Sequence, residues 1–254
     1  PPGTLKPGTL DARWGEAAAA CCRKSVELAK AGEIAGITSA PFNKEAFHMA
    51  GYKAMDDMTY FEECFAKGEA YQVGEVAGIW TTPVTFHVAF RAIPDLITKE
   101  AVLAKIRSLD RVLTAAQVSP ARIGVVALNV HCGEGGMFGR EEIDIITPAI
   151  QQAKAEGFNV AGPVPPDSAF PLALRGDYQG LVLMYHDQAN IATKVTTVTS
   201  RVVLYVGGPV VLATPGHGTA FDIAGRGLAD PAGLRLAIAT AARIARAGLK
   251  ESAR

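Results

Sequence analysis

The chain has 254 residues, of which 49% are hydrophobic and 20% are charged, a balance typical of a globular protein with a sizeable core. Lys plus Arg and Asp plus Glu both number 25, so no basic excess is available to bind a nucleic-acid backbone. The sequence also lacks an uninterrupted apolar run of the length that crosses a membrane. We therefore expect neither a nucleic-acid partner nor a membrane partner.

The four cysteines, Cys21, Cys22, Cys64 and Cys132, form no C-x-x-C pair. A disulfide framework or a thiolate zinc site is not expected from this spacing, and a reducing cytoplasm is the expected location. The sequence begins Pro-Pro-Gly, with no initiator Met and no leader-like segment.

Strand-like and helix-like segments alternate along the chain, which is typical of an α/β protein. In the first half of the chain we expect a helix over 10–31, a strand over 33–38, a short helix over 45–50, and hairpin strands over 76–80 and 84–88. A helix over 98–116, a strand over 122–129, a Gly-rich loop over 131–139 and a helix over 141–156 are expected to follow. The last expected elements are strands over 180–185 and 202–206 and a helix over 231–247. The Pro- and Gly-rich stretches 161–167 and 207–218 are expected to be loops.

Three of the five histidines, His87, His131 and His186, lie at or just after the carboxyl end of an expected strand. Open α/β sheets place their ligand sites at that edge. Three neutral imidazoles that converge from separate strands would form a divalent-metal site. Taken singly, each histidine is more often a hydrogen-bonded core residue than a metal ligand, because the spacing carries no fixed ligand signature.

A Gly-rich motif, HGTAFDIAGRGLADP, covers residues 217–231. Its glycines would let backbone amides approach a phosphate or an adenine, and its acidic residues could bind ribose hydroxyls, which favours NAD over NADP. The alternative is a connection followed by a helix cap at Asp230. The G-x-G-x-x-G signature of dinucleotide-binding sheets is missing. The residues expected to contact the cofactor are His217, Gly218, Thr219, Ala220, Asp222 and Asp230.

Several segments, in this order, resemble the 4-hydroxythreonine-4-phosphate dehydrogenase family within the isocitrate and isopropylmalate dehydrogenase superfamily. They are ITSAPFNK (37–44), TFHVAFRAIPD (85–95), ALNVHCGEGGMFGREEID (127–144), GPVPPDSAF (162–170), MYHDQ (184–188) and HGTA (217–220). The resemblance implies an isocitrate/isopropylmalate dehydrogenase-like fold of two α/β domains with an active-site cleft between them. Residues 1–40 and 215–254 would belong to the first domain, and 41–214 to the second, which would hold the metal site and the dimer interface. Roughly the first quarter of a typical family member has no counterpart in this sequence.

The same resemblance implies a metal- and NAD-dependent dehydrogenase that oxidises a secondary alcohol and decarboxylates the resulting keto acid. Its metal ligands would be His87, His131 and His186, with the third ligand supplied by the other subunit of a homodimer. Lys44 and Lys194 would move the proton or pair with a substrate anion, and Asp187 would orient a ligand histidine. The metal itself could be any of several first-row ions or Mg²⁺.

The sequence departs from the family at the substrate positions. Asp57 and Met58 replace a His-Thr pair that contacts the substrate in the family. The family also has a Lys, an Asn and an Arg as substrate contacts. Only the Lys is retained, as Lys194, because Val203 and Leu212 replace the Asn and the Arg. A pocket with these residues would suit a cis-dihydrodiol carboxylate from aromatic catabolism, and residues 207–227 are similar to that branch of the family. The physiological small-molecule substrate is therefore left open between the two.

Two function classes compete with a dehydrogenase. Acyltransferases share the superfamily fold but need no histidine metal site, so bound metal would distinguish them. A non-catalytic relative that binds metal or nucleotide is the other alternative, and measurable turnover would exclude it.

Overall fold

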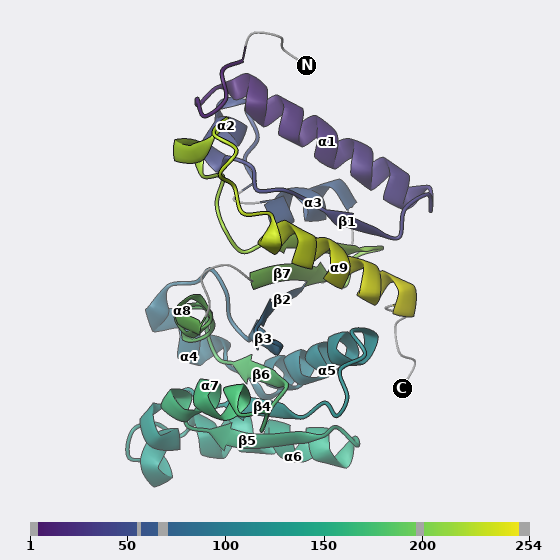
Figure 1. The fold of residues 1–254 in the computed structure, drawn as a ribbon. Coiled ribbons are helices and arrows are strands. Elements are labelled where there is room, and N and C mark those ends of the chain that lie inside the picture. Colours follow the sequence, from purple (N-terminus) through teal and green to yellow (C-terminus); the bar gives the residue numbers. More distant parts are fainter. Residues whose placement is uncertain (1–4, 55–56, 66–70, 197–200, 249–254) are drawn as a thin grey trace. The chain divides into compact units, whose positions relative to one another are not determined.

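The computed structural model describes residues 5–54, 57–65, 71–196 and 201–248, and the chain divides into two compact α/β units (Figure 1). Unit 1 comprises Pro1–Tyr71 and Thr199–Arg246, and unit 2 comprises Gln72–Val198 and Ala247–Arg254. These boundaries differ from the expected division after residues 40 and 214. Residues beyond 40 belong to unit 1 because α2 and α3 pack on α1, and residues before 215 belong to it because β7 pairs with β8.

Unit 1 contains strands in the order β1-β8-β7. These are β1 (Gly36–Thr38), β8 (Val211–Pro215) and β7 (Arg201–Val206). β1 runs parallel to β8, and β8 runs antiparallel to β7. All five residues of β8 are buried, as expected for a strand with neighbours on both sides. The prediction of a loop over 207–218 was wrong at this strand. The Gly and Pro residues on both sides of its short apolar stretch are typical of loops, and they led to that prediction.

Helices flank the strands of unit 1 (Figure 1). They are α1 (Ala12–Lys30), α2 (Lys44–Met49), α3 (Asp57–Phe65), the short η4 (Phe221–Ile223) and α9 (Ala232–Ala247). The Asp11 side chain accepts a hydrogen bond from the Arg13 amide at 2.9 Å and begins α1, whereas Gly32, with φ +74°, follows its end. The buried face of α1 packs into a core that includes Phe47, Tyr60 and Leu212.

The packing of α1 on α2 depends on Gly15. A Cβ atom at this position would clash with the carbonyl group of Ala46 and would lie 2.8 Å from Cα of Phe47. We expect Gly15→Ala to lower the free energy of unfolding by about 3 kcal/mol, because backbone atoms cannot move aside as a flexible side chain can. Denaturant unfolding would measure this change. Gly208→Ala is the control, since its Cβ would make one ordinary contact at 3.8 Å, and equal stability of the two variants would contradict the prediction.

Unit 2 contains strands in the order β2-β3-β6-β4-β5. They are β2 (Tyr71–Val76), β3 (Ile79–Pro83), β6 (Gly180–Leu183), β4 (Ile123–Val126) and β5 (Val160–Val164). β3, β6, β4 and β5 are parallel, and only β2 is antiparallel to its neighbour β3. The central strands β3, β4 and β6 are buried at every position. This burial accounts for the continuous apolar sequences of β4 and β6, whereas β3 buries two threonines, Thr81 and Thr82.

Helices cover both faces of the unit 2 strands. The helical segments are η1 (Phe90–Ala92), α4 (Ile93–Leu96), α5 (Lys99–Ala115), η2 (Val130–Gly136), η3 (Glu142–Ile146), α6 (Thr147–Ala155), α7 (Pro166–Leu174) and α8 (His186–Thr196). α7 and α8 share a core cluster with β6 that includes Phe170, Leu181 and Ala189. On α5, Leu109 and Leu113 pack against Gly180, where a Cβ would meet both leucines at 3.0 Å.

The hairpin prediction was shifted along the chain. The strands cover Tyr71–Val76 and Ile79–Pro83 rather than 76–80 and 84–88, and the turn lies at Ala77 and Gly78. Both turn residues have positive φ, 51° and 81°, as the tight turn of a hairpin requires. Alanine is rarely found in that conformation, so the turn carries no conventional sequence signal. Residues 161–167 were predicted as a loop, but β5 and the start of α7 occupy much of this range.

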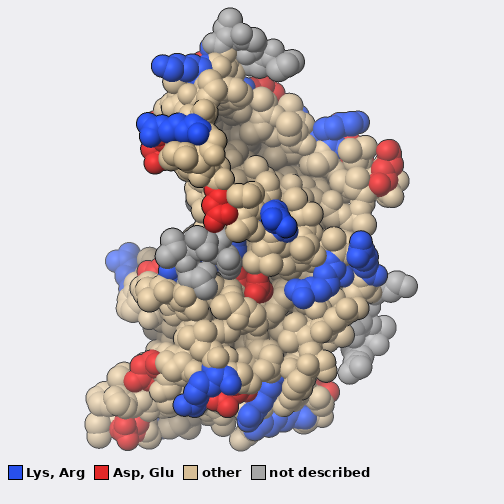
Figure 2. All heavy atoms as spheres, in the orientation of Figure 1, with Lys and Arg blue, Asp and Glu red and all other residues tan. Residues whose placement is uncertain are grey.

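The face of the molecule in Figure 2 shows positive and negative side chains interspersed among uncharged residues. This distribution agrees with the zero net charge of the sequence. Among the described helices, none combines the length and apolar character that a membrane-spanning segment needs.

Candidate active site

His87 and His186 come together because the chain after β3 keeps following the end of β6. The amide of Val84 donates to the carbonyl oxygen of Leu183 at 2.8 Å. The amide and the hydroxyl of Thr85 both donate to the carbonyl oxygen of Met184, at 3.1 and 2.9 Å. Residues 84–88 were predicted as a strand, yet this shorter extension still delivers His87 to the carboxyl edge, where α8 begins at His186.

The two imidazole rings lie with their centroids 5.5 Å apart. The ring of Phe86 packs against both, at 4.4 Å from His87 and 5.0 Å from His186. Two imidazoles bound tetrahedrally to one ion, each with a metal–nitrogen distance of about 2 Å, have ring centroids about 5 Å apart. The spacing of this pair therefore fits a shared divalent ion.

Polar contacts hold the start of α8 in place. Asp187 Oδ1 lies 2.6 Å from His186 Nδ1, and this contact favours the tautomer in which Nε2 of His186 carries the free lone pair. Gln188 accepts a hydrogen bond from the amide of Met184 at 2.7 Å and donates one to the carbonyl oxygen of Ala127 at 2.8 Å. Gln188 thus links the ends of β6 and β4. Gln188 lies in the MYHDQ segment, but no role was predicted for it from the sequence.

His131 does not join this pair within the chain. The described residues contain no group of three or more His, Cys, Asp or Glu side chains that could hold a metal ion. His131 is exposed and lies in η2, directly after β4 and its short extension. The structure thus brings together two of the three predicted ligands, and the role of His131 stays a prediction.

The Gly-rich motif lies in unit 1 and begins directly after β8. His217 and Gly218 are exposed, and a Cβ at Gly218 would meet open space, so the backbone is accessible there. Ala220 has left-handed backbone angles, φ 48° and ψ 53°, and leads into η4. Asp222 is exposed, whereas Asp230 accepts a hydrogen bond from the amide of Ala232 at 2.9 Å. Asp230 therefore caps α9, as the alternative interpretation of this residue predicted.

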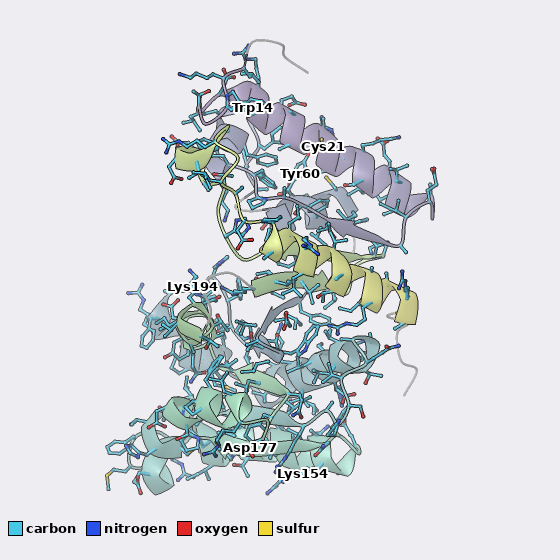
Figure 3. The ribbon with its side chains drawn as sticks, in the orientation of Figure 1. Trp14, Cys21, Tyr60, Lys154, Asp177 and Lys194 are labelled. Carbon is cyan, nitrogen blue, oxygen red and sulfur yellow. The ribbon has the colours of Figure 1, made fainter. Side chains whose placement is uncertain are left out.

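A cavity of about 300 Å³ in unit 1 borders this motif. Thr219 and Phe221 contribute from the motif, Trp14 from α1, and Phe42 and Asn43 from the segment before α2. Figure 3 marks Trp14 near the beginning of α1. Aromatic rings with a few hydroxyl and amide groups make up much of the lining, a composition typical of sites for planar organic ligands. Sequence analysis missed the contributions from α1 and from residues 42–43.

The predicted lysines and substrate residues lie on several elements. Lys44 is exposed at the first position of α2, and Lys194 is exposed in the last turn of α8 (Figure 3). Val203 and Leu212 are buried in β7 and β8, and Leu212 packs in the core beside α1. Their roles as substrate contacts stay predictions. Asp57 and Met58 begin α3, but their side chains lie outside the described part of the chain.

Two titratable groups near these elements are perturbed. Burial lowers the pKa of the Arg201 guanidinium, at the start of β7. Burial also raises the pKa of the Cys132 thiol, and the nearby carboxylates of Glu142 and Asp167 raise it further. Cys132 is therefore a neutral thiol near pH 7 rather than a reactive thiolate.

Comparison with solved structures defines the class of the fold. An isocitrate dehydrogenase from Methylococcus capsulatus, at 12% identity and a TM-score of 0.52, shares the fold and covers 82% of this chain and 69% of its own. A 4-hydroxythreonine-4-phosphate dehydrogenase from Klebsiella pneumoniae is much closer, with 34% identity and a TM-score of 0.80 over 96% of this chain and 75% of its own. The chain thus has the mixed α/β fold of isocitrate dehydrogenase-like enzymes.

The chain belongs to the PdxA family, described as pyridoxal phosphate biosynthetic protein PdxA, which matches residues 2–241. It is 36% identical over 244 residues to the D-threonate 4-phosphate dehydrogenase of Pectobacterium atrosepticum, covering 96% of this chain and 75% of that protein. A terephthalate 1,2-cis-dihydrodiol dehydrogenase from Burkholderia xenovorans is also similar, at 28% identity and a TM-score of 0.70, over 94% of this chain and 76% of its own. Relatives from Pseudomonas aeruginosa and Rhizobium meliloti are 41% and 40% identical, and the chain spans only 67% and 65% of their lengths.

These findings confirm the family predicted from the sequence motifs, and they confirm the predicted fold. The chain is a member of a family of dehydrogenases, which are oxidoreductases.

Proposed function

We propose that this chain is the NAD-dependent, divalent-metal-assisted dehydrogenase that its sequence motifs predict. The observation that carries the proposal is the pair formed by His87 and His186, with ring centroids 5.5 Å apart at adjacent parallel strand ends. In the reaction, a secondary alcohol loses its hydroxyl proton and a hydride, and the resulting β-keto acid loses CO₂. A divalent ion held by this pair would lower the pKa of the substrate hydroxyl and stabilise the enolate left by decarboxylation.

The hydride acceptor is NAD, which would bind at the Gly-rich motif of unit 1. Exposed backbone at Gly218 suits close approach of a phosphate or sugar, and Asp222 remains exposed for a ribose hydroxyl. Asp230 has a structural role instead, because its carboxylate caps the N-terminus of α9. The cavity lined by Thr219, Phe221 and Trp14 offers aromatic surface next to the same motif.

Proton movement and orientation fall to charged groups of the chain itself. Asp187 accepts a hydrogen bond from Nδ1–H of His186 and so leaves Nε2 as the ligand nitrogen. Lys194 follows His186 on α8 by about two helical turns, and its exposed ammonium can move a proton or pair with a substrate anion. Lys44, with Asn43 capping its helix at 2.9 Å, is the second candidate for this role.

The chain acts as a homodimer in which His131 completes the partner's metal site. This differs from the expectation that His186, the third ligand, comes from the other subunit, because His186 lies beside His87 of the same chain. Exposed apolar side chains lie on the same segments of the chain as each half of the ligand set. Val130, Met137, Phe138 and Ile143 lie on the segment from η2 to η3 with His131, and Val88, Phe90, Leu96, Ile191 and Val195 lie on the segments that carry His87 and His186. Met137 and Phe90 are 75% and 76% exposed. Large apolar side chains gathered in this way mark interaction surfaces. A two-fold axis would place the first group of one subunit on the second group of the other.

The substrate is a phosphorylated hydroxy acid of the kind named for the more similar relatives, D-threonate 4-phosphate or 4-hydroxythreonine 4-phosphate. The second candidate is a cis-dihydrodiol carboxylate, because the dihydrodiol dehydrogenase from Burkholderia xenovorans has the same fold. Apolar residues at Val203 and Leu212, where the family has an Asn and an Arg, favour this second class.

The test combines metal content and turnover on one purified sample, before and after chelation. We expect about one divalent ion per chain, as three shared imidazoles predict. NADH absorbance should rise with one of the two substrate classes and should stop rising after chelation. NAD binding without metal under any condition would overturn the mechanism, and turnover with only the dihydrodiol would reassign the substrate. Acyl transfer by a metal-free protein would support the acyltransferase alternative.

A further inference from the structure

The segment that carries His131 has an unusual backbone. Five consecutive residues, His131 to Gly135, have positive φ angles between 44° and 79°. Three of them, His131, Cys132 and Glu134, are not glycines, and side chains disfavour this left-handed region. Such a turn persists only where surrounding groups hold it in place.

The carboxylate of Glu142 supplies much of that support. Glu142 is 3% exposed, at the first position of η3. Its Oε1 accepts hydrogen bonds from the backbone amides of Leu128 and Asn129, both at 2.8 Å, and its Oε2 accepts one from Asn129 Nδ2 at 3.0 Å. Bonds from backbone amides to a buried carboxylate are charge-assisted and strong. Glu142 therefore fixes the backbone directly before the left-handed turn.

The same carboxylate also borders the turn itself. A Cβ at Gly133 would lie 2.8 Å from Glu142 Oε2 and 2.7 Å from the carbonyl oxygen of Gly139. Only glycine leaves room for the carboxylate at this distance. Cys132 Sγ reaches the carbonyl oxygen of Pro163 at 3.7 Å and ties the turn to the end of β5. The turn is thus enclosed by Glu142, Gly139 and Pro163.

We propose that Glu142 is a positioning residue for His131: its buried carboxylate holds the amides of Leu128 and Asn129 and thereby the left-handed turn that presents the imidazole. The inference rests on the proposed function, in which His131 is a metal ligand. In this role Glu142 acts through the backbone amides that it bonds. A buried charge costs free energy unless it is well bonded. A buried carboxylate that bonds backbone amides therefore indicates that the position of this backbone, and of His131 after it, must be accurate.

Hydrogen exchange and zinc affinity together test this role. In Glu142→Gln and Glu142→Ala we expect the amides of Leu128 and Asn129 to exchange at least about 10-fold faster, and Zn²⁺ affinity to fall about 10–100-fold. Amides in the core of β6 should keep their protection, since the fold itself remains. Gly133→Ala should produce the same two changes, because its methyl group displaces the carboxylate from the opposite side.

Glu141→Gln is the matched control. Glu141 undergoes the same change of charge one residue earlier, but its carboxylate accepts its hydrogen bond from the side chain of Asn129, at 2.6 Å, rather than from a backbone amide. The control should keep wild-type protection at Leu128 and wild-type zinc affinity. Unchanged amide exchange in both Glu142 variants would overturn the inference, and so would faster exchange with undiminished zinc affinity. A wild-type chain that binds no zinc would refute the proposed metal site, whereas amide exchange would still decide whether Glu142 holds the turn.

Discussion

Replacing His186 with alanine should lower dehydrogenase activity about 10³-fold and should remove the bound divalent ion, because the metal supplies several kcal/mol of transition-state stabilisation. His186 contributes one of the two imidazoles whose rings lie 5.5 Å apart. Its side chain is only partly buried, so the loss of activity should come without a large loss of stability. Metal content by elemental analysis, turnover by NADH absorbance and the unfolding midpoint would be measured on the same preparation.

Two further variants sharpen this experiment. Asp187→Asn keeps the shape of the side chain but weakens its bond to His186 Nδ1, so activity and metal affinity should fall about 10–100-fold. His48→Gln is the control, since His48 bonds the carbonyl oxygen of Ala54 within unit 1, whereas the paired histidines belong to unit 2. Retention of the metal and of full activity in His186→Ala would contradict the proposed centre.

Mixing two inactive variants should restore activity if the site is shared between subunits. A heterodimer of one His131→Ala chain and one His186→Ala chain contains one intact set of ligands and one doubly damaged set. We expect this heterodimer, purified through two different tags, to show about half the activity of the wild-type dimer. Each parental homodimer should show almost none.

The heterodimer of His87→Ala and His186→Ala chains is the matched control. Here each site keeps one lesion, because both residues belong to the same half of the ligand set. This heterodimer should therefore remain inactive. Equal recovery in both mixtures, or none in the first although its subunits pair, would show that His131 does not complete the partner's site.

Local sequence signals were sufficient to predict a helix or strand whose residues are determined within that element, such as by a helix cap or an apolar run. The helix α5 begins after Thr98, whose hydroxyl accepts a hydrogen bond from the Ala101 amide at 3.1 Å, and it ends within a residue of the prediction. Strand β4 was predicted from its apolar run, and its residues are buried throughout. β8 and β5 were missed because glycine and proline flank or interrupt them, and a parallel neighbour, which the local sequence does not reveal, stabilises each of them.

The candidate site was predictable to a similar degree. The convergence of His87 and His186 follows from parallel strands that end at one edge of a sheet. It was predicted correctly, although the strand predicted over 84–88 was wrong. The separation of His131 from this pair could not be derived from spacing, because a left-handed turn sets its direction. Glu142 and Gln188 were not assigned roles either, since their contacts to backbone groups leave no periodic pattern in the sequence.

The order of the two units along the chain has a consequence for biosynthesis. Nearly all of unit 2 is one continuous segment, Gln72–Val198, whereas unit 1 needs β7, β8 and α9 from the far end of the chain to complete its strands. On the ribosome, unit 2 can therefore fold before β8, the parallel neighbour of β1, has been synthesised. The exposed edge of a waiting strand invites aggregation. Slow synthesis of the last third of the chain should lower the yield of native protein more than slow synthesis of the first third.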